Sequence, residues 1–406
     1  MGSAAHDAWV EEARAADLVA YARARSPKIL RTTTEWIGPC PGCGGTDRFG
    51  ISLRKSIWSC RQGGGTPIGG DVIALVQHVE GCDFRTACTI LTGRRPPGVE
   101  PETEAERAER RAVRAAREVA SRAKAAAAER ESARFREAER ERLRDLWRAA
   151  GPVADSPAEA YLARRGLAPP HGADLRCALA HPFFASGAHG AAVLHRGPAL
   201  LAAIRGPGTG PEGRFAGLHA TWIDLDAPDG KLRLADPATG ECLPARKARG
   251  SVTDGRIELV RVVDPVRLVL GEGIETVLSA WEALRACRPV FVEGCAFWSG
   301  VALGNIAGKA ADTVPHPSER RLDRAGRLRR LFVPSGTPAD DAGPGIPIPP
   351  SVRELWLCGD GDSDRFATTL ALERARRRYA RPGLSVEIAW APEGQDFNDV
   401  LRSAAA

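Results

Sequence analysis

The stretch LWLCGDGDSDRFATTLALERA, residues 355–375, has two halves of opposite character. An apolar run ends at Cys358, and Asp360, Asp362 and Asp364 then follow at every second position. A pattern typical of a helix comes directly afterwards. Three carboxylates so close together repel one another, so the chain needs a compensating positive charge at this point.

Acidic residues also follow two other predicted strands of the same region. Glu272 comes after the apolar run RLVLG, and Asp396 comes after LSVEIAWAPEGQ. Strands that alternate with helices from residue 265 to 406 predict an α/β domain, a parallel sheet flanked by helices. The carboxyl ends of parallel strands share one edge of the sheet, and ligands bind at that edge. We therefore expect these acids to converge on one site.

A cluster of carboxylates is a site for hard divalent cations such as Mg²⁺ or Mn²⁺. A pair of such ions can activate a hydroxyl group and stabilise the charge on a transferring phosphoryl group. The other interpretation is a polar loop in which Asp and Gly are ordinary turn residues. Three acidic positions in register with three strands favour the metal site.

Taken together, GEGIET, DGD and GQDFND resemble the Toprim domain of topoisomerases, primases and related nucleases, over about residues 266–401. That family carries a Glu after its first strand and an Asp-x-Asp after its third, and its primase branch has a further acid downstream. The resemblance implies that Asp360, Asp362 and Asp396 hold Mg²⁺. It implies that Glu272 is a general acid/base or a further Mg²⁺ ligand, and that Asp360 and Asp362 share with Glu272 the catalytic role.

A second cluster of metal-ligand type lies near the N-terminus, in CPGCGGTDRFGISLRKSIWSCRQGGG, residues 40–65. Cys40 and Cys43 form a Cys-x-x-Cys knuckle, and Cys60 follows after a hairpin-like stretch. Thiolates on such a ribbon are the usual ligands of structural Zn²⁺. The segment resembles the N-terminal zinc ribbon of bacterial DnaG-type and phage primases, with GGDVIALV following the hairpin.

The fourth zinc ligand departs from the family pattern. The family expects a ligand shortly after Cys60, where this chain has Gly63. His78, Cys82, Cys88 or a water could complete the site, or the site is degenerate. The remaining interpretation is a Gly-rich ribbon with free thiols.

The composition divides the chain into four zones. Residues 1–95 hold the zinc ribbon and flanking helices, and residues 100–150 form a charged run of Ala, Arg and Glu. This run predicts a long solvated helical linker, with a short coiled coil or a basic nucleic-acid-binding helix as alternatives. Residues 151–264 predict an α+β basic subdomain. Residues 265–406 form the α/β domain, with a strand expected in PVFVEG (289–294) and a Pro- and Gly-rich insertion or mobile loop around 304–350.

The basic subdomain offers candidate contacts for nucleic acid and nucleotide phosphates. They are Arg164, Arg165, Arg246, Lys247 and Arg249. The zone resembles the basic N-terminal half of the phage and plasmid primase catalytic core, which precedes Toprim. The alternative for any one of these residues is a solvated surface charge. Trp58 and Trp222 could stack on bases, although Trp is more often a core residue.

The mild positive charge of the chain permits a polyanionic partner but does not require one. The formal net charge is +6, and no apolar run is long enough to cross a membrane. No signal peptide is present, so we expect a cytoplasmic, nucleoid-associated protein with reduced cysteines. GNIAGKA, residues 304–310, lacks the spacing and the Ser or Thr of a Walker motif, so a replicative helicase is expected as a separate partner.

The resemblances together imply a DNA primase, a DNA-directed RNA polymerase and nucleotidyltransferase. Its partners would be a single-stranded DNA template, nucleoside triphosphates and the RNA primer, in the replication of a phage, plasmid or host chromosome. Its cofactors would be Mg²⁺ or Mn²⁺ and Zn²⁺. The alternatives are a Toprim-type metal-dependent nuclease and a catalytically inactive DNA-binding homologue.

Overall fold

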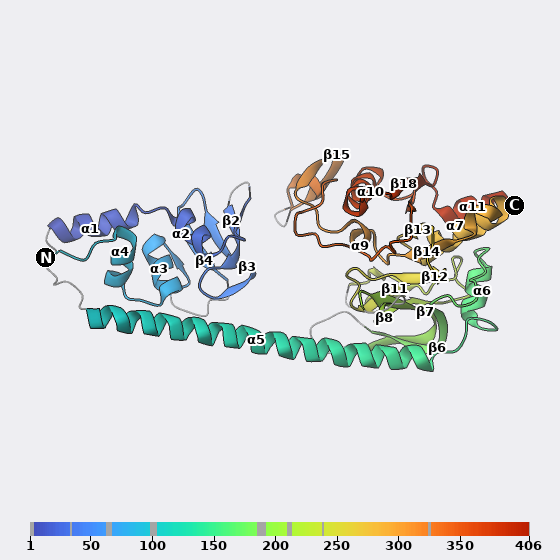
Figure 1. The fold of residues 1–406 in the computed structure, drawn as a ribbon, viewed down its shortest axis with the longest axis horizontal. Helices are drawn as coiled ribbons and strands as arrows, with labels where there is room; N and C mark the ends of the chain where they lie inside the picture. The colour runs from blue at the N-terminus through green and yellow to red at the C-terminus, as the bar shows by residue number, and fades with distance from the viewer. Residues whose placement is uncertain are drawn as a thin grey trace. The chain divides into compact units, whose positions relative to one another are not determined.

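The computed structural model describes residues 4–32, 35–61, 67–97, 104–184, 192–208, 213–237, 239–323 and 326–405. It consists of two compact units, residues 1–130 and residues 131–406 (Figure 1). Gly63 lies outside the described residues. Each unit is described by itself below.

The first unit is a small five-stranded sheet with four helices. The helices are α1 (Ala4–Arg14), α2 (Leu18–Arg25), α3 (Val72–Glu80) and α4 (Phe84–Thr92). The strands run in the order β1 (Leu30–Arg31), β2 (Glu35–Cys40), β3 (Gly44–Ser52), β4 (Ile57–Cys60) and β5 (Gly69–Gly70). Asp71 and Asp83 cap α3 and α4 by accepting backbone N–H bonds in the first turn. Phe49, Ile51 and Trp58 fill the core between the sheet and α3.

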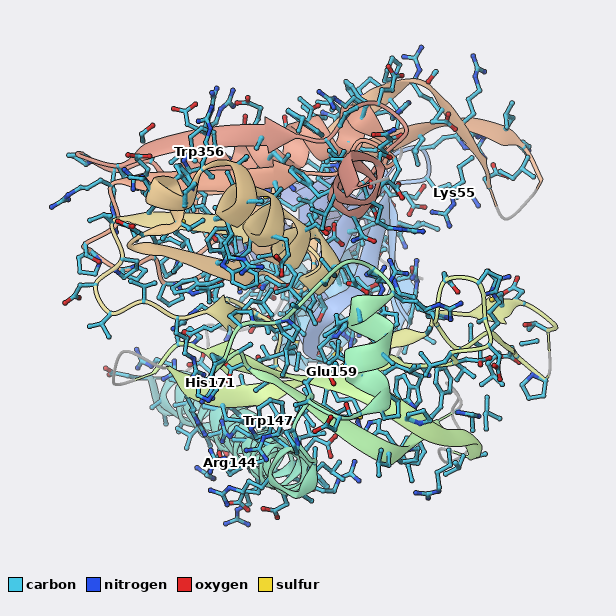
Figure 2. The ribbon with its side chains drawn as sticks, turned by 90° about the vertical axis from the view of Figure 1, so that its right-hand side faces the viewer. Lys55, Arg144, Trp147, Glu159, His171 and Trp356 are labelled. Carbon is cyan, nitrogen blue, oxygen red and sulfur yellow. The ribbon has the colours of Figure 1, made fainter. Side chains whose placement is uncertain are left out.

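A long helix, α5 (Glu104–Ala149), begins in the first unit and ends in the second. It forms where the sequence predicts a helix, because the run contains strong helix formers and no Gly or Pro. The side chains described between residues 104 and 135 are exposed, as expected of a solvated spacer. The last turns differ from that expectation. Leu143 is buried, and Trp147 packs against the strands of the second unit (Figure 2).

The second unit begins with a four-stranded antiparallel sheet. Its strands run in the order β11 (Arg246–Gly250), β8 (Arg214–Trp222), β7 (Val193–Gly206) and β6 (Leu175–Phe184). A short ribbon, β9 (Leu234–Ala235) with β10 (Cys242–Leu243), lies between β8 and β11 in the chain. Helix α6 (Pro157–Ala163) precedes the sheet, with Ser156 as its N-cap and Pro157 at its first position.

The second sheet of this unit is the one expected from the alternation of strands and helices. Its strands run in the order β12 (Ile257–Val260), β14 (Cys295–Ser299), β13 (Arg267–Gly271), β17 (Glu354–Gly359) and β18 (Ser385–Trp390). Four of the five are parallel, and β12 is antiparallel to β14. The accompanying helices are α7 (Ile274–Cys287), α8 (Pro289–Val292), α9 (Leu303–Ala307), α10 (Arg365–Tyr379) and α11 (Phe397–Ala405).

The two sheets of the second unit share one hydrophobic core. Leu200 and Ile204 from β7 belong to the same buried cluster as Val269 and Phe297 from the parallel sheet. Strand β12 lies before residue 264, yet it pairs with β14. The boundary at residue 264 therefore does not separate the two sheets, since zone 151–264 contributes β12 to the parallel sheet. The two sheets form a single folded unit, because they bury their apolar faces in a shared core.

Two expectations for the region after α7 are changed by the structure. The expected strand in PVFVEG is wrong: its first four residues form the short helix α8, and the strand is β14, which begins at Cys295. Pro289 sits at the first position of α8, and Gly294 reverses the chain with a φ of 70°. The segment 304–350 contains most of α9 and an antiparallel hairpin of β15 (Thr313–Leu322) and β16 (Leu328–Pro334).

Among the described residues, no helix combines the length and apolar character needed to cross a membrane.

Candidate active site and zinc centre

The acidic residues of the second unit follow the carboxyl ends of neighbouring parallel strands. Glu272 directly follows β13, and Asp360 and Asp362 follow β17. Strand β17 lies between β13 and β18, and Gly359 at its end pairs with Trp390 at the end of β18. The loops after these three strands therefore leave the sheet at the same edge.

Two of these loops are joined by backbone hydrogen bonds at Gly361. Its N–H donates to the carbonyl of Gln395 (2.9 Å), and the N–H of Gly394 donates to the carbonyl of Gly361 (2.9 Å). A Cβ atom at residue 361 would lie 2.0 Å from the carbonyl oxygen of Pro392, so only glycine fits there. This close approach brings the Asp-Gly-Asp turn next to the loop that carries Asp396.

Asp360 is the carboxylate at the centre of this edge. Its pKa is raised to about 6, chiefly because the group is partly buried, and the negative charges of three further acids add to the rise. These acids are Asp396, Asp362 and Glu272. The hydroxyl of Thr276 donates to Asp360 Oδ2 (3.1 Å) and opposes the shift. The other three predicted acids therefore lie close enough to Asp360 to act on it electrostatically.

The four acids do not form a closed cage. Within the described parts of the chain, the one group of Cys, His, Asp or Glu ligand atoms that all lie within 4.8 Å of one another is in the first unit. Mg²⁺ sites commonly use one or two carboxylates and are completed by waters and substrate phosphates. An open carboxylate edge of this kind fits a metal that arrives with a phosphorylated substrate.

Asp396 also has a local structural role. Its Oδ1 accepts the N–H of Asp399 (2.7 Å), and Asp399 Oδ2 accepts the N–H of Asp396 (3.2 Å). This reciprocal capping box starts α11. It fixes the position of Asp396 while leaving its second carboxylate oxygen outside the cap.

A buried charge cluster that was not predicted from the sequence lies beside the acidic edge. Glu275 in α7 accepts a hydrogen bond from the hydroxyl of Tyr161 (2.6 Å), and Lys231 Nζ lies 3.1 Å from the same oxygen. Burial alone would raise the pKa of Glu275, but these contacts and the nearby Arg246 hold it below its usual range. The available signal was an acid within the otherwise apolar pattern IETVLSAW.

Arg246 is a predicted basic residue that lies beside the acidic edge. Its Nη1 lies 3.9 Å from the position a Cβ atom would take at Gly273, the residue before α7. Gly273 directly follows Glu272. The first strand residue of the PARKARG cluster thus places a cation beside the loop that carries Glu272.

The other four predicted basic residues contact the protein itself. Arg164 donates to the carbonyls of Leu225 and Ala227, and Arg165 donates to the carbonyl of Asp229. Lys247 Nζ donates to the carbonyl of Phe184 (2.7 Å). Arg249 pairs with Glu139 of α5 (2.6 Å). These contacts stabilise the fold, and nucleic-acid binding by the four residues stays a prediction.

Trp58 and Trp222 are core residues. Each is about 2% exposed. The indole N–H groups donate to the carbonyls of Asp71 and His181 respectively. The prediction that these two rings could stack on bases is therefore wrong, because both side chains are buried.

The raised pKa of Asp360 predicts that Asp360→Asn stabilises the protein at neutral pH. The folded-state pKa lies above the ordinary value, so ionisation of this carboxylate destabilises the fold. Stability is therefore lost as the pH rises from about 4 to about 6. Asparagine removes this cost and can still accept from Thr276. We expect a gain of about 1–2 kcal/mol at pH 8 without divalent metal and almost none at pH 4. Thermal unfolding of variant and wild type at both pH values measures it; equal gains at both would contradict it.

Removal of the Tyr161 hydroxyl tests the buried cluster. Tyr161→Phe leaves the Glu275 carboxylate buried without its shortest hydrogen bond. We expect a loss of about 1–3 kcal/mol in the free energy of unfolding of the second unit, measured by urea denaturation. Tyr379→Phe is a suitable control, since the Tyr379 hydroxyl accepts a hydrogen bond from the neutral backbone N–H of Ile346 instead of donating one to a carboxylate.

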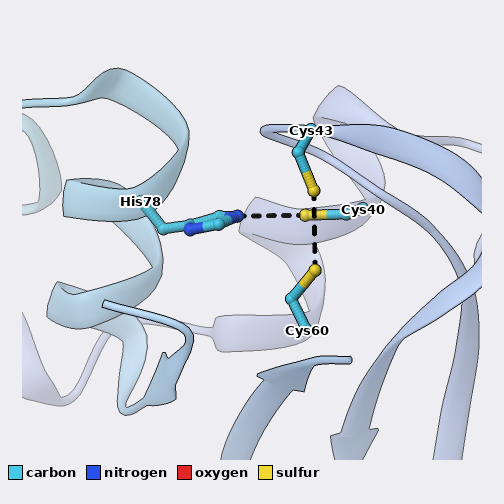
Figure 3. Close-up of side chains that lie close together, drawn as sticks. All are labelled: Cys40, Cys43, Cys60 and His78. Carbon is cyan, nitrogen blue, oxygen red and sulfur yellow. Dashed lines mark hydrogen bonds between the residues drawn. The ribbon is translucent and has the colours of Figure 1, made fainter. Parts of the chain in front are cut away.

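The cysteines of the first unit converge with a histidine on one point (Figure 3). Cys40 and Cys43 bracket the turn between β2 and β3, Cys60 ends β4, and His78 extends from α3. The Sγ atoms of Cys43 and Cys60 are 3.5 Å apart, and Cys40 Sγ lies 3.2 Å from His78 Nε2. Of the residues that the sequence offered as a fourth zinc ligand, His78 is therefore the one that joins the three cysteines.

This donor set fits tetrahedral Zn²⁺. Ordinary bond lengths place two zinc-bound sulfurs about 3.8 Å apart, and a sulfur and a nitrogen about 3.5 Å apart. The observed separations are close to these values. Cys82 and Cys88 lie outside the cluster, and Cys88 is buried in the core of α4. Burial raises the pKa of the Cys40 thiol to about 12, so a metal that binds there has to displace its proton.

Comparison with protein families gives one match within the second unit. Residues 137–259 match a domain of unknown function, DUF7146. This range covers the end of α5 and the antiparallel sheet with β12. A search of curated proteins gives no match.

The chain is similar in structure to bacterial DnaG-type primase domains at low TM-scores. The crystal structure of the Aquifex aeolicus primase zinc-binding and RNA polymerase domains is 15% identical, with 99% of this chain and 83% of that chain covered and a TM-score of 0.36. The DnaG primase catalytic domain bound to single-stranded DNA is 15% identical, at 67% and 78% coverage and a TM-score of 0.36. A Pseudomonas aeruginosa primase domain is 15% identical, at 64% and 73% coverage and a TM-score of 0.34. At this level of similarity, the function has to be argued from the site residues.

Proposed function

We propose that the protein is a DNA primase that makes short RNA primers on single-stranded DNA by metal-dependent nucleotidyl transfer. The observation that carries the proposal is the placement of acids after the carboxyl ends of β13 and β17 and in the loop after β18. Burial, together with the charges of these acids, raises the pKa of Asp360 to about 6. Such a concentration of negative charge at a ligand-binding edge is suited to divalent metal and is otherwise unfavourable.

The acids would share the work of the Toprim-type site. Asp360, Asp362 and Asp396 would hold Mg²⁺ or Mn²⁺, with Glu272 as a general acid/base or a further ligand. The metal, when bound, would stabilise charge on the transferring phosphoryl group. Thr276 keeps the Asp360 carboxylate oriented, and the capping box of α11 keeps Asp396 in place.

Arg246 would bind phosphates of the incoming nucleoside triphosphate or of the strand. It lies beside Gly273 and Glu272, at the edge where the metal-bound phosphates would arrive. The buried carboxylate of Glu275 acts on Arg246 from the protein side and would restrain its guanidinium. Phosphate contacts of this kind are independent of base sequence.

The first unit would be a zinc ribbon that contacts the template. Its Cys₃His donor set closes a small ribbon around three strands, as in structural zinc sites. Helix α5 would tether this unit to the second unit through a charged, solvated stretch. A separate helicase would supply unwound template.

One preparation separates the primase from its two alternatives. Purified protein with single-stranded DNA, the four ribonucleoside triphosphates and Mg²⁺ should produce short RNA that is sensitive to alkali and absent without nucleotides. A Toprim-type nuclease would instead shorten labelled DNA without nucleotides. An inactive homologue would do neither while still binding the strand. Absence of RNA product, beside a known primase that is active under the same conditions, overturns the proposal.

A further inference from the structure

The β15–β16 hairpin is a basic element that the proposed site does not use. Residues 313–334 contain six arginines against two acids. The Pro- and Gly-rich composition predicts an insertion or mobile loop here, and the structure shows an antiparallel hairpin beside α10 (Figure 1). It belongs to the same unit as the acidic edge.

Like charges face each other directly across this hairpin. Arg320 pairs in register with Arg330, and Arg321 pairs with Arg329. Directly opposite like charges destabilise a two-stranded sheet. Arg329 is compensated by Asp323 (3.2 Å). Within the described residues, no ion pair or side-chain hydrogen bond compensates Arg320 or Arg330, and both are exposed, so this pair is available to an anion from outside the unit.

The outer face of the hairpin combines these arginines with apolar side chains. Side chains alternate along a strand, so Leu328, Arg330 and Phe332 point to the same side. Arg320 and Leu322 lie opposite Arg330 and Leu328 on that side. Leu322, Leu328 and Phe332 are 62%, 59% and 57% exposed. Val333, on the other face, is buried. The outer face therefore offers charge for phosphates and a free ring for a base.

The base of the hairpin contacts the loop of the acidic edge. His316, which is 5% exposed, occupies the bulge in β15, and its Nδ1 accepts the N–H of Glu319 (2.8 Å). Its Nε2 lies 2.9 Å from Asp364, the N-cap of α10. Asp364 follows Asp362 by two residues. The hairpin therefore contacts the turn that carries two of the predicted metal ligands.

We propose that the outer face of the β15–β16 hairpin binds single-stranded nucleic acid beside the acidic edge. Arg320 and Arg330 would contact consecutive phosphates, and Phe332 would stack on an unpaired base. A single strand suits this face better than a duplex, because only unpaired bases expose their faces to a side chain. The inference rests on the proposed function only in taking a nucleic acid as the ligand of this unit.

The test uses the full chain and a fluorescent oligo(dT) strand, without nucleotides or divalent metal. Arg320→Ala/Arg330→Ala should weaken binding about twentyfold at about 0.1 M salt and reduce the slope of log K against log salt by about 1.4. Phe332→Ala should weaken binding about five- to a hundredfold with an unchanged slope, and should spare duplex binding. Arg288→Ala/Arg353→Ala is the matched control, since both residues are exposed and lie at the opposite end of the parallel sheet.

Arg320→Glu separates binding from folding. It replaces a repulsive cross-strand pair with an attractive one, so the melting midpoint should stay or rise while oligo(dT) binding falls. If Arg320→Ala/Arg330→Ala binds oligo(dT) with the affinity and salt slope of the wild type, the inference is overturned. The hairpin would then be assigned to an acidic protein surface. Binding that depends on the hairpin without primer synthesis supports the inference and counts against the primase. Primer synthesis without hairpin-dependent binding supports the primase and counts against the inference.

Discussion

Asp360→Asn and Asp362→Asn should each reduce primer synthesis by about a thousandfold or more while single-stranded DNA binding changes by less than about twofold. Each substitution removes a charged oxygen that would hold Mg²⁺, and neither changes the shape of the site. Asp360 is the acid on which the charges of Asp362, Asp396 and Glu272 converge. Incorporation of labelled ribonucleotides on single-stranded DNA measures the loss.

Glu393→Gln is the matched control for these variants. Glu393 is an exposed acid on the loop before Asp396, and it is not among the acids that raise the pKa of Asp360. It removes one negative charge from the same edge and should leave synthesis within about twofold of wild type. Full activity in Asp360→Asn would exclude a metal-holding role for this carboxylate. A loss of DNA binding equal to the loss of synthesis would also contradict the assignment.

Loss of one zinc ligand should unfold the first unit. Cys60→Ser or His78→Ala should reduce bound zinc from one ion per chain to a small fraction, and residues 1–97 should become sensitive to protease. Structural Zn²⁺ contributes about 10–16 kcal/mol of binding free energy in small zinc modules, which is more than a unit of this size gains from its core. Elemental analysis and limited proteolysis of the purified chain give the two readouts.

Cys82→Ser separates His78 from the other candidates for the fourth ligand. Cys82 lies outside the cluster of Cys40, Cys43, Cys60 and His78. The variant should keep its zinc and its protease resistance. Stoichiometric zinc of unchanged affinity in His78→Ala would place the fourth ligand elsewhere, and loss of zinc in Cys82→Ser would do the same.

Much of the candidate site is readable from local patterns in the chain. Each of the three predicted strands ends in an acidic turn, and the resulting order of strands and helices suffices to predict a parallel sheet with acids at one edge. The Cys-x-x-Cys knuckle and Cys60 likewise indicate three zinc ligands. The long helix α5 follows from composition alone. These features depend on spacing within a few residues, which a sequence records directly.

Other features depend on which segments pack together. His78 joins the cysteines because α3 lies against β4. The ring centroid of His78 is 4.9 Å from that of Trp58 in β4. Glu275 is paired by Tyr161, which is more than a hundred residues away in the chain. Strand β12 joins the parallel sheet from the preceding zone. Long-range packing decides these contacts, and no local periodicity encodes them.

The β15–β16 hairpin shows the same division within one segment. Its arginines are visible in the sequence, but their spacing does not reveal that Arg320 faces Arg330 or that His316 lies next to Asp364. Strand register sets which charges oppose each other, and a shift of one residue would move every side chain to the other face. Local chemistry along the chain thus defines which groups are available, whereas tertiary packing fixes which of them meet, because contact energies depend on distance in space.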